Sequence, residues 1–302
     1  MISLDMSSVY ALGAAFSWCL ASVFGHRPAV ELGSVHFNRL RMVVSTAMLA
    51  IYGVLTGVTF AVPSEAMGLI VLSGLIGAAG GDYFLFKTMQ RLGPRRTGVL
   101  FAANAPIAAV LGWMFLNEVL STKHVLAIVI GFVGIVLAII YGKRRDLAHV
   151  WENITPPLWL GVLFGMMAAL GQAIGVLLMR PVMEGGLDPV VAGCLRTSVA
   201  MLVFWAILPV DAIKGRLPPR FLPPKHLIIP ILCNGFFGLA FGVALLLKAL
   251  ETGPVGTVAI LSATSPLMLL PFVWAKTRLV PPAGAWVGAV LVVLCSAMLV
   301  DG

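Results

Sequence analysis

The chain has 302 residues, of which 60% are hydrophobic and 11% are charged, and its formal net charge is +8. Soluble domains carry about 25% charged and about 45–50% apolar residues, so this composition excludes a domain that folds in water. A positive net charge alone does not indicate a nucleic-acid partner, and none is expected here. The remaining class is an integral membrane protein, in which each spanning helix needs about 20 mainly apolar residues.

Apolar runs of that length follow one another along the whole chain. They lack the alternation of outer-membrane strands, so helices are the remaining way to cross a bilayer. Asp5 is the only charged residue before the first run, which therefore lacks the basic start of a signal peptide and is interpreted as a retained helix. We predict an all-α membrane protein with ten transmembrane helices, at residues 8–25, 37–57, 66–86, 97–116, 123–141, 157–179, 189–209, 227–249, 255–275 and 281–300.

The basic residues gather in alternate connections between these runs. Loops after odd-numbered runs hold 14 Lys and Arg, whereas the connections on the opposite side hold three. Basic residues concentrate on the cytoplasmic side of membrane proteins. The count therefore places the odd-to-even loops in the cytoplasm and both termini outside.

The sequence contains an internal repeat. Residues 92–107 (LGPRRTGVLFAANAPI) align with 252–267 (TGPVGTVAILSATSPL) at a shift of 160. The chain thus divides into a repeat at 1–145, a linker at 146–156 and a second repeat at 157–302. Because each repeat has five helices, an odd number, the two are inverted, and inverted repeats are typical of secondary transporters whose substrate lies between the halves.

The repeat also carries a family resemblance. An Arg opens the second helix of each half (Arg41 and Arg196), and residues 91–121 run from a basic loop through a Pro-containing helix to Asn117-Glu118. This pattern resembles the drug/metabolite transporter superfamily, and in particular its EamA-like ten-helix exporters. The resemblance implies export of a small metabolite and both termini in the cytoplasm, which is opposite to the charge count.

Ionisable side chains inside spans are candidate functional residues, because each costs roughly 2.5–3.5 kcal/mol on insertion scales. Asp82 lies inside the third span. It could take up a proton, coordinate a cation, bind a substrate ammonium or pair with Arg41. A guanidinium could bind a carboxylate, but Arg41 and Arg196 lie near the starts of their spans, where we expect them to extend toward lipid headgroups.

Amide, hydroxyl and indole groups complete the predicted site. Amides both donate and accept hydrogen bonds, which suits a zwitterion or a heterocycle, although inside membranes they also join helices. A Trp in mid-span lines a cavity or fills the bundle, since Trp usually marks the interface. The predicted substrate-binding residues are Trp18, Asp82, Asn104, Gln172, Asn234, Thr264 and Ser265.

Two further patterns concern helix geometry. Pro106 and Pro266 occupy equivalent positions, and kinked helices at matching places in two halves point to a binding site. We predict that both act as hinges. Glycine pairs four residues apart allow close helix packing, and they occur at Gly77/Gly81, Gly161/Gly165, Gly171/Gly175, Gly238/Gly242 and Gly284/Gly288.

The sequence contains no nucleotide-binding loop, HExxH or GxSxG motif, and its five His lie in loops or at span edges, where we expect solvated side chains. We therefore predict no catalytic residue, metal or cofactor. The predicted function is secondary active export of small polar or amphipathic metabolites across a bacterial inner membrane, by proton coupling or exchange. The partners are then the small-molecule substrate and the lipid bilayer. The alternatives are a membrane-embedded enzyme and a lipid flippase-like protein.

Overall fold

The computed structural model describes residues 5–119, 121–141, 157–215, 221–265, 267–268 and 283–300, and these contain helices and connections but no strand. The first half holds α1 (Met6–Leu32), α2 (Ser34–Leu55), α3 (Ser64–Ser73), η1 (Gly74–Gly81), α4 (Asp82–Ala102), α5 (Asn104–Leu116) and α6 (Thr122–Tyr141). The second half holds α7 (Leu158–Glu184), α8 (Pro189–Ala206), α9 (Leu208–Ile213), α10 (Lys225–Asn234), η3 (Gly235–Phe241), α11 (Gly242–Ala249), α12 (Val255–Ser262) and α14 (Ala283–Val300).

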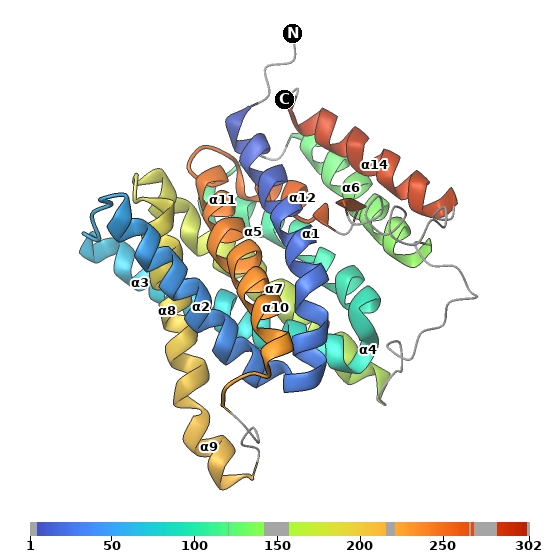
Figure 1. The fold of residues 1–302 in the computed structure, drawn as a ribbon. Coiled ribbons are helices and arrows are strands. Elements are labelled where there is room, and N and C mark those ends of the chain that lie inside the picture. The colour runs from blue at the N-terminus through green and yellow to red at the C-terminus, as the bar shows by residue number, and fades with distance from the viewer. Residues whose placement is uncertain are drawn as a thin grey trace.

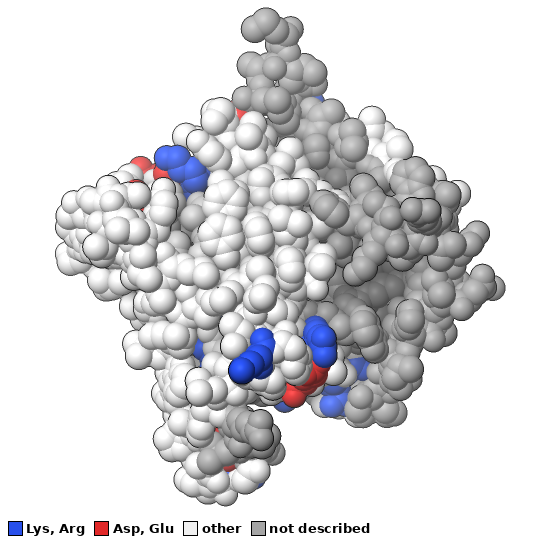
Figure 2. All heavy atoms as spheres, viewed as in Figure 1, with Lys and Arg blue, Asp and Glu red and all other residues white. Residues whose placement is uncertain are grey.

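The helices have the composition of membrane spans. Five stretches of the described chain are long and apolar enough to cross a bilayer, and two shorter apolar helices accompany them. Figure 2 shows one face of the molecule, with charged side chains near its two ends and a broad uncharged band between them. The all-α membrane class is therefore confirmed, whereas the count of ten spans stays a prediction. The linker at 146–156 and the residues from 269 to 282 lie outside the described residues.

One expected connection is wrong. Residues 87–96 were predicted to form a loop between the third and fourth spans, but they are helical and belong to α4. The basic residues that suggested a loop, Lys87, Arg91, Arg95 and Arg96, are also good helix formers.

Helices from equivalent predicted spans of the two halves pack against each other. α2 contacts α8, α5 contacts α12, and α6 contacts α14. In Figure 1, α6 and α14 lie side by side at the edge of the molecule, and the start of α1 and the end of α14 lie at the same end. That placement agrees with an even number of crossings and with inverted repeats.

Each half also contains a π-helical segment at the equivalent place. η1 starts at Gly74 and η3 at Gly235, 161 residues later, and each continues without a break into the next α-helix. In a π-helix the hydrogen bonds run from i to i+5, and such turns occur frequently at functional sites. η1 packs against α7 and α8, whereas η3 packs against α1 and α2. Each π segment is therefore enclosed by the first two helices of the other half.

Glycines make the contact of η1 with α7 unusually close. A Cβ atom placed on Gly175 would lie 2.8 Å from the Cα of Gly77, and one on Gly171 would lie 3.2 Å from the Cα of Gly81. Two of the predicted glycine pairs thus face each other, backbone against backbone, as expected for small residues at membrane helix interfaces.

Candidate functional site

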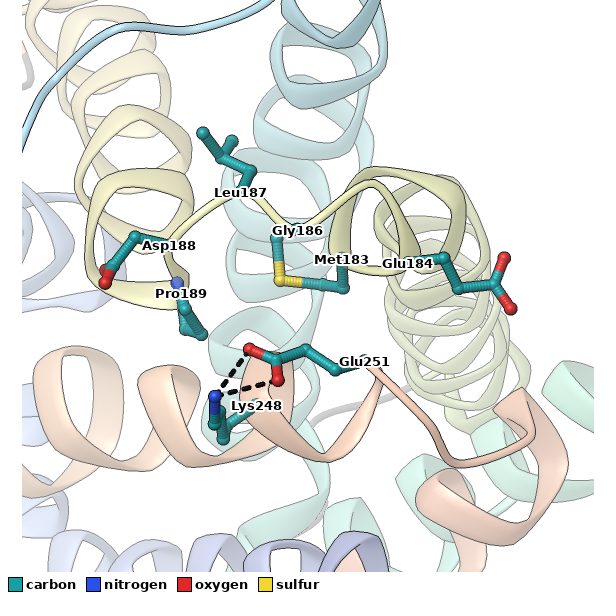
Figure 3. Close-up of a pocket in the computed structure, with 8 residues that line it drawn as sticks. All are labelled: Met183, Glu184, Gly186, Leu187, Asp188, Pro189, Lys248 and Glu251. Carbon is teal, nitrogen blue, oxygen red and sulfur yellow. Dashed lines mark hydrogen bonds and ion pairs between the residues drawn. The ribbon is translucent and has the colours of Figure 1, made fainter.

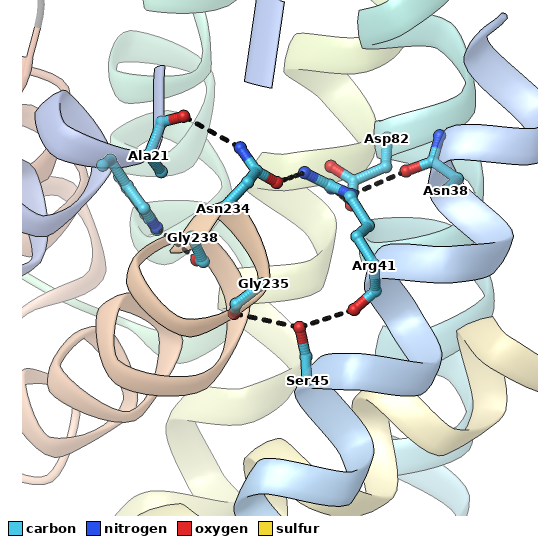
Figure 4. A network of polar contacts seen from close by, with 9 residues as sticks. Ala21, Asn38, Arg41, Ser45, Asp82, Asn234, Gly235 and Gly238 are labelled. Carbon is cyan, nitrogen blue, oxygen red and sulfur yellow. Dashed lines mark hydrogen bonds and ion pairs between the residues drawn. The ribbon is translucent and has the colours of Figure 1, made fainter. Parts of the chain in front are cut away.

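Arg41 is the centre of a buried polar cluster on α2. Its exposed fraction is 5%, and its guanidinium forms an ion pair with Asp82. Nε donates to Asn38 Oδ1 at 2.8 Å and Nη1 donates to Asn234 Oδ1 at 3.2 Å. Figure 4 shows these three acceptors converging on Arg41 from α2, α4 and α10. The expected extension of Arg41 toward headgroups is therefore wrong, because its partners satisfy the charge inside the protein.

Aromatic rings cover the same guanidinium. The Cζ atom of Arg41 lies 4.8 Å from the ring centroid of Phe86 and 5.6 Å from that of Phe37. The two rings meet edge to face with centroids 5.3 Å apart. A cation over a ring face gains electrostatic attraction, most when it is desolvated, so these rings add to the carboxylate in stabilising the buried charge.

Asp82 is positioned by the π segment. It is the first residue of α4, directly after η1, so the register of η1 determines which way its side chain points. Asp82 pairs with Arg41 of its own half, which is one of the alternatives that the sequence left open.

Asn234 joins the cluster to the first helix. It ends α10 just before η3, accepts from Arg41 and donates from Nδ2 to the carbonyl oxygen of Ala21 at 2.9 Å. Trp18 lies one turn away on α1, half-buried, and its Nε1 donates to the carbonyl oxygen of Gly238 in η3 at 2.8 Å. The predicted residues Trp18, Asp82 and Asn234 therefore lie around one contact between the two halves.

Arg196 is the counterpart of Arg41 in the second half, and it is also buried, with an exposed fraction of 3%. Its Nη2 would lie 2.7 Å from a Cβ on Gly77 and 2.8 Å from one on Gly175, so it sits at the seam between η1 and α7. Its Nε has no hydrogen-bond partner in the described part of the chain. The expectation of a headgroup-facing side chain is wrong here too.

The other predicted residues lie outside this cluster. Asn104 is buried at the start of α5 and donates to the carbonyl oxygen of Phe101 at 2.6 Å. Thr264 is buried just after α12 and donates to the carbonyl oxygen of Leu261 at 2.7 Å. Gln172 is half-buried on α7, and its backbone nitrogen would lie 3.6 Å from a Cβ on Gly81. Ser265 is half-buried directly after Thr264. A substrate role for these four residues stays a prediction.

The helices around the two prolines are interrupted at equivalent places. α4 gives way to α5 at Ala103, and α12 ends before Ala263, 160 residues later. Pro106 lies in the first turn of α5, where backbone N–H groups lack intrahelical partners and Pro is tolerated. Pro266 lies outside the described residues. A hinge role for either proline stays a prediction.

A charged recess of about 370 Å³ opens where the α7–α8 connection meets the end of α11 (Figure 3). Its charged groups already have partners within the protein. Lys248 Nζ lies 2.9 Å from Glu251 Oε1, and Asp188 Oδ1 accepts from the backbone nitrogen of Val190 at 2.7 Å. The recess therefore offers less to a substrate than the buried cluster does.

Glu118 connects the two halves at a helix end. It follows Asn117, which takes the left-handed conformation with φ of 54° after α5, and its Oε1 accepts from the backbone nitrogen of Val255 at 2.8 Å. Burial raises the pKa of Glu118, and the hydrogen bond from Val255 and the charge of Arg180 oppose that rise.

Sequence reasoning missed several members of the cluster. Asn38 and Ser45 were not selected, although they lie three residues before and four after Arg41 and so share its helix face. Ser45 Oγ donates to the carbonyl oxygen of Gly235 at 3.0 Å, which ties α2 to η3. His36 was expected to be solvated but is 5% exposed, with its ring 6.4 Å from that of Phe221. In the described ranges, no three His, Cys, Asp or Glu side chains could together hold a metal ion.

Comparison with known proteins bears separately on the fold and on the family of this chain. A solved structure described only as "Crystal structure of protein" superposes with a TM-score of 0.76, covering 98% of this chain and 96% of that chain. At 17% identity it shows the fold alone. No curated protein sequence matches the chain. The model of the EamA-like transporter family matches twice, at residues 6–140 and 159–300. The chain therefore belongs to the EamA-like transporter family, within the drug/metabolite transporter superfamily.

Proposed function

We propose that this protein is a secondary transporter that exports small polar or amphipathic metabolites, such as amino acids, across a bacterial inner membrane. Transport would proceed by alternating access, driven by proton coupling or by exchange. The proposal rests on the family and on one observation: Arg41, a buried cation of the first half, is held by Asp82 of its own half and by Asn234 of the other. A rigid scaffold has little need for such a costly cluster at the contact between its halves.

The cluster suits a moving interface. The bond between Arg41 and Asn234 and the bond between Asn234 and Ala21 both cross from one half to the other. If the halves rock against each other, these bonds must break and form again, whereas the ion pair of Arg41 with Asp82 travels within one half. Protonation of Asp82 would weaken that ion pair, which gives a route by which a proton gradient could bias the two states.

Counterflow in proteoliposomes tests this function. Vesicles preloaded with one compound should take up its labelled form without ATP, with a rate that saturates, for at least one member of an amino acid and metabolite panel. A transporter coupled through Asp82 should lose its dependence on the pH gradient in Asp82→Asn. Glu65→Gln removes an exposed carboxylate from the first turn of α3 and should retain the dependence. Absence of counterflow across the panel would refute the proposal and favour an embedded enzyme or a flippase-like protein.

A further inference from the structure

Arg196 differs from Arg41 in what surrounds it. Both are buried Arg residues at equivalent places in the repeats, 155 residues apart. At the same shift, Asn38 corresponds to Gly193, and at the shift of 160, Asp82 corresponds to Gly242. Two of the residues that accept hydrogen bonds from Arg41 therefore correspond to glycines in the second half. Glycine has no side chain that could accept a hydrogen bond from Arg196.

The third acceptor is also lost. Asn234 is the residue directly before η3, and the residue directly before η1 is Ser73. The Oγ of Ser73 donates to the carbonyl oxygen of Gly175 at 2.8 Å, and it accepts no hydrogen bond from Nε of Arg196. Nε of Arg196 has no hydrogen-bond partner among the residues that the structure describes.

The two buried arginines together carry more positive charge than Asp82 balances. Arg41 and Arg196 are both buried, and Asp82 is committed to Arg41 through the ion pair, although its charge also acts on Arg196. A buried charge without a partner is strongly unfavourable, and inside a membrane it marks a functional site. An anion from outside the chain would balance the charge, and the planar guanidinium fork matches a carboxylate or a phosphate through two parallel hydrogen bonds.

We propose that Arg196 binds the anionic oxygen group, carboxylate or phosphate, of the transported substrate. This rests on the proposed function and names the substrate class for the same site. Arg41 then has a separate role. Together with Asp82 it forms a neutral pair that is satisfied within the protein, while Arg196 is the buried charge that the ligand would balance.

The position of Arg196 couples binding to the movement of the halves. Its Nη2 lies against Gly77 of η1 and Gly175 of α7, whose backbones touch. An anion reaches the guanidinium only if this seam opens. Where Gly77 meets Gly175 and Gly81 meets Gly171, no side chains interlock, so at these points η1 can separate from α7 without displacing a side chain of either glycine pair. Binding of the anion is thus linked to opening of the contact between the first and the second half.

Ligand-induced thermal stabilisation of the purified protein in detergent tests the proposal. The probes are L-amino acids, each paired with its carboxamide, together with inorganic phosphate and glycerol 3-phosphate. At least one amino acid should bind about tenfold or more tightly than its carboxamide, or a phosphate should bind to a similar extent, because the carboxamide lacks the charge that supports two charge-assisted hydrogen bonds. The amino acid arm and the phosphate arm identify which anionic group the site takes.

Three variants assign the effect to Arg196. Arg196→Gln should lose the preference for the anion, and Arg196→Lys should retain part of it, since Lys keeps the charge but not the fork. Arg27→Gln removes an exposed Arg, 66% accessible, at the far end of α1, and should bind like the wild type. Because Nε of Arg196 lacks a partner within the described chain, Arg196→Gln should unfold at a temperature no lower than the wild type when no ligand is present.

Distinct results overturn the two proposals separately. Equal binding of acid and carboxamide, full anion preference in Arg196→Gln, or a large loss of unliganded stability in that variant would each refute the anion site. If a neutral or cationic compound still shows counterflow in any of these cases, the transport function stands without the anion site. If no compound shows counterflow, the transport function itself fails.

Discussion

Replacing Asp82 with Asn should destabilise the protein strongly, because it leaves buried positive charge without its counterion. The side chains of the pair are 7% exposed for Arg41 and 18% for Asp82, so water can replace little of the lost interaction. Removal of one partner from a buried pair costs about 3–5 kcal/mol. Arg41 keeps its bonds to Asn38 and Asn234 in the variant, so we expect the lower end of that range, about 3 kcal/mol.

Thermal unfolding in detergent measures this loss. A thiol-reactive dye is a suitable reporter, since Cys19, Cys194 and Cys295 are buried and Cys233 is half-buried in the folded protein. On the scale for large domains, 1 kcal/mol shifts the melting temperature by about 2–4 °C. Asp82→Asn should therefore melt about 6 °C or more below the wild type.

The double variant separates charge from packing. Arg41→Gln combined with Asp82→Asn removes both members of the pair, so it should recover about half or more of the loss, since neutral pairs can replace buried ion pairs at little cost. If Asp82→Asn melts like the wild type, the pair does not stabilise the fold. If the double variant is as unstable as the two single losses added together, the two charges are not coupled, and the interpretation of the cluster fails.

Three further variants test other contacts. Gly77→Ala would bring a Cβ to 2.7 Å from Arg196 and to the backbone of α7, so it should cost about 1–3 kcal/mol of stability, whereas Gly68→Ala meets nothing within 4 Å and should be neutral or stabilising in the same melting assay. Trp18→Phe removes the donor to Gly238 and should cost about 1 kcal/mol; unchanged melting would mean that this hydrogen bond contributes nothing. The raised pKa of Glu118 means that its protonated form favours the folded state, so the contribution of Glu118 to stability is fully present below the ordinary value of 4.5 and is lost as pH rises through the raised pKa. Glu118→Gln should consequently melt above the wild type at pH 7, with a difference that shrinks as the pH falls toward that ordinary value, and a difference independent of pH would contradict the assignment.

Hydropathy predicted the fold class because a membrane span is a local property of some 20 consecutive residues. The repeat and the position of Asp82 could also be read from the sequence, since both depend on residue order alone. The burial of Arg41 could not be predicted from the sequence. It depends on Asn234, which lies 193 residues later and approaches Arg41 only when the two halves pack. The symmetry between Arg41 and Arg196 was the available signal that both are internal, and proximity to the starts of their spans outweighed it.

Residues 87–96 show an error of a different kind, in which a local sequence signal was assigned to the wrong backbone conformation. Basic residues were interpreted as marking a loop because positive charge marks the cytoplasmic side of a membrane. Charge indicates the side of the membrane, however, and not the backbone conformation, and Lys and Arg rank among the better helix formers. The π segments were likewise invisible to hydropathy, because replacing an i+4 by an i+5 hydrogen bond leaves the composition unchanged.

The register of the π segment η1 determines whether Asp82 points toward Arg41. Successive residues of an α-helix are turned by about 100° about its axis, and a π turn accommodates about one residue more than an α turn. If this segment closed into an ordinary α-helix with all its residues kept, Asp82 would turn by about 100° away from Arg41, whereas deleting a single glycine from Gly74–Gly81 would remove the extra residue and leave the direction of Asp82 nearly unchanged. The contact between Asp82 and Arg41 therefore depends on the π turn holding its extra residue, so a one-residue deletion within η1 is expected to disturb it less than a one-residue deletion in the regular first turn of α4.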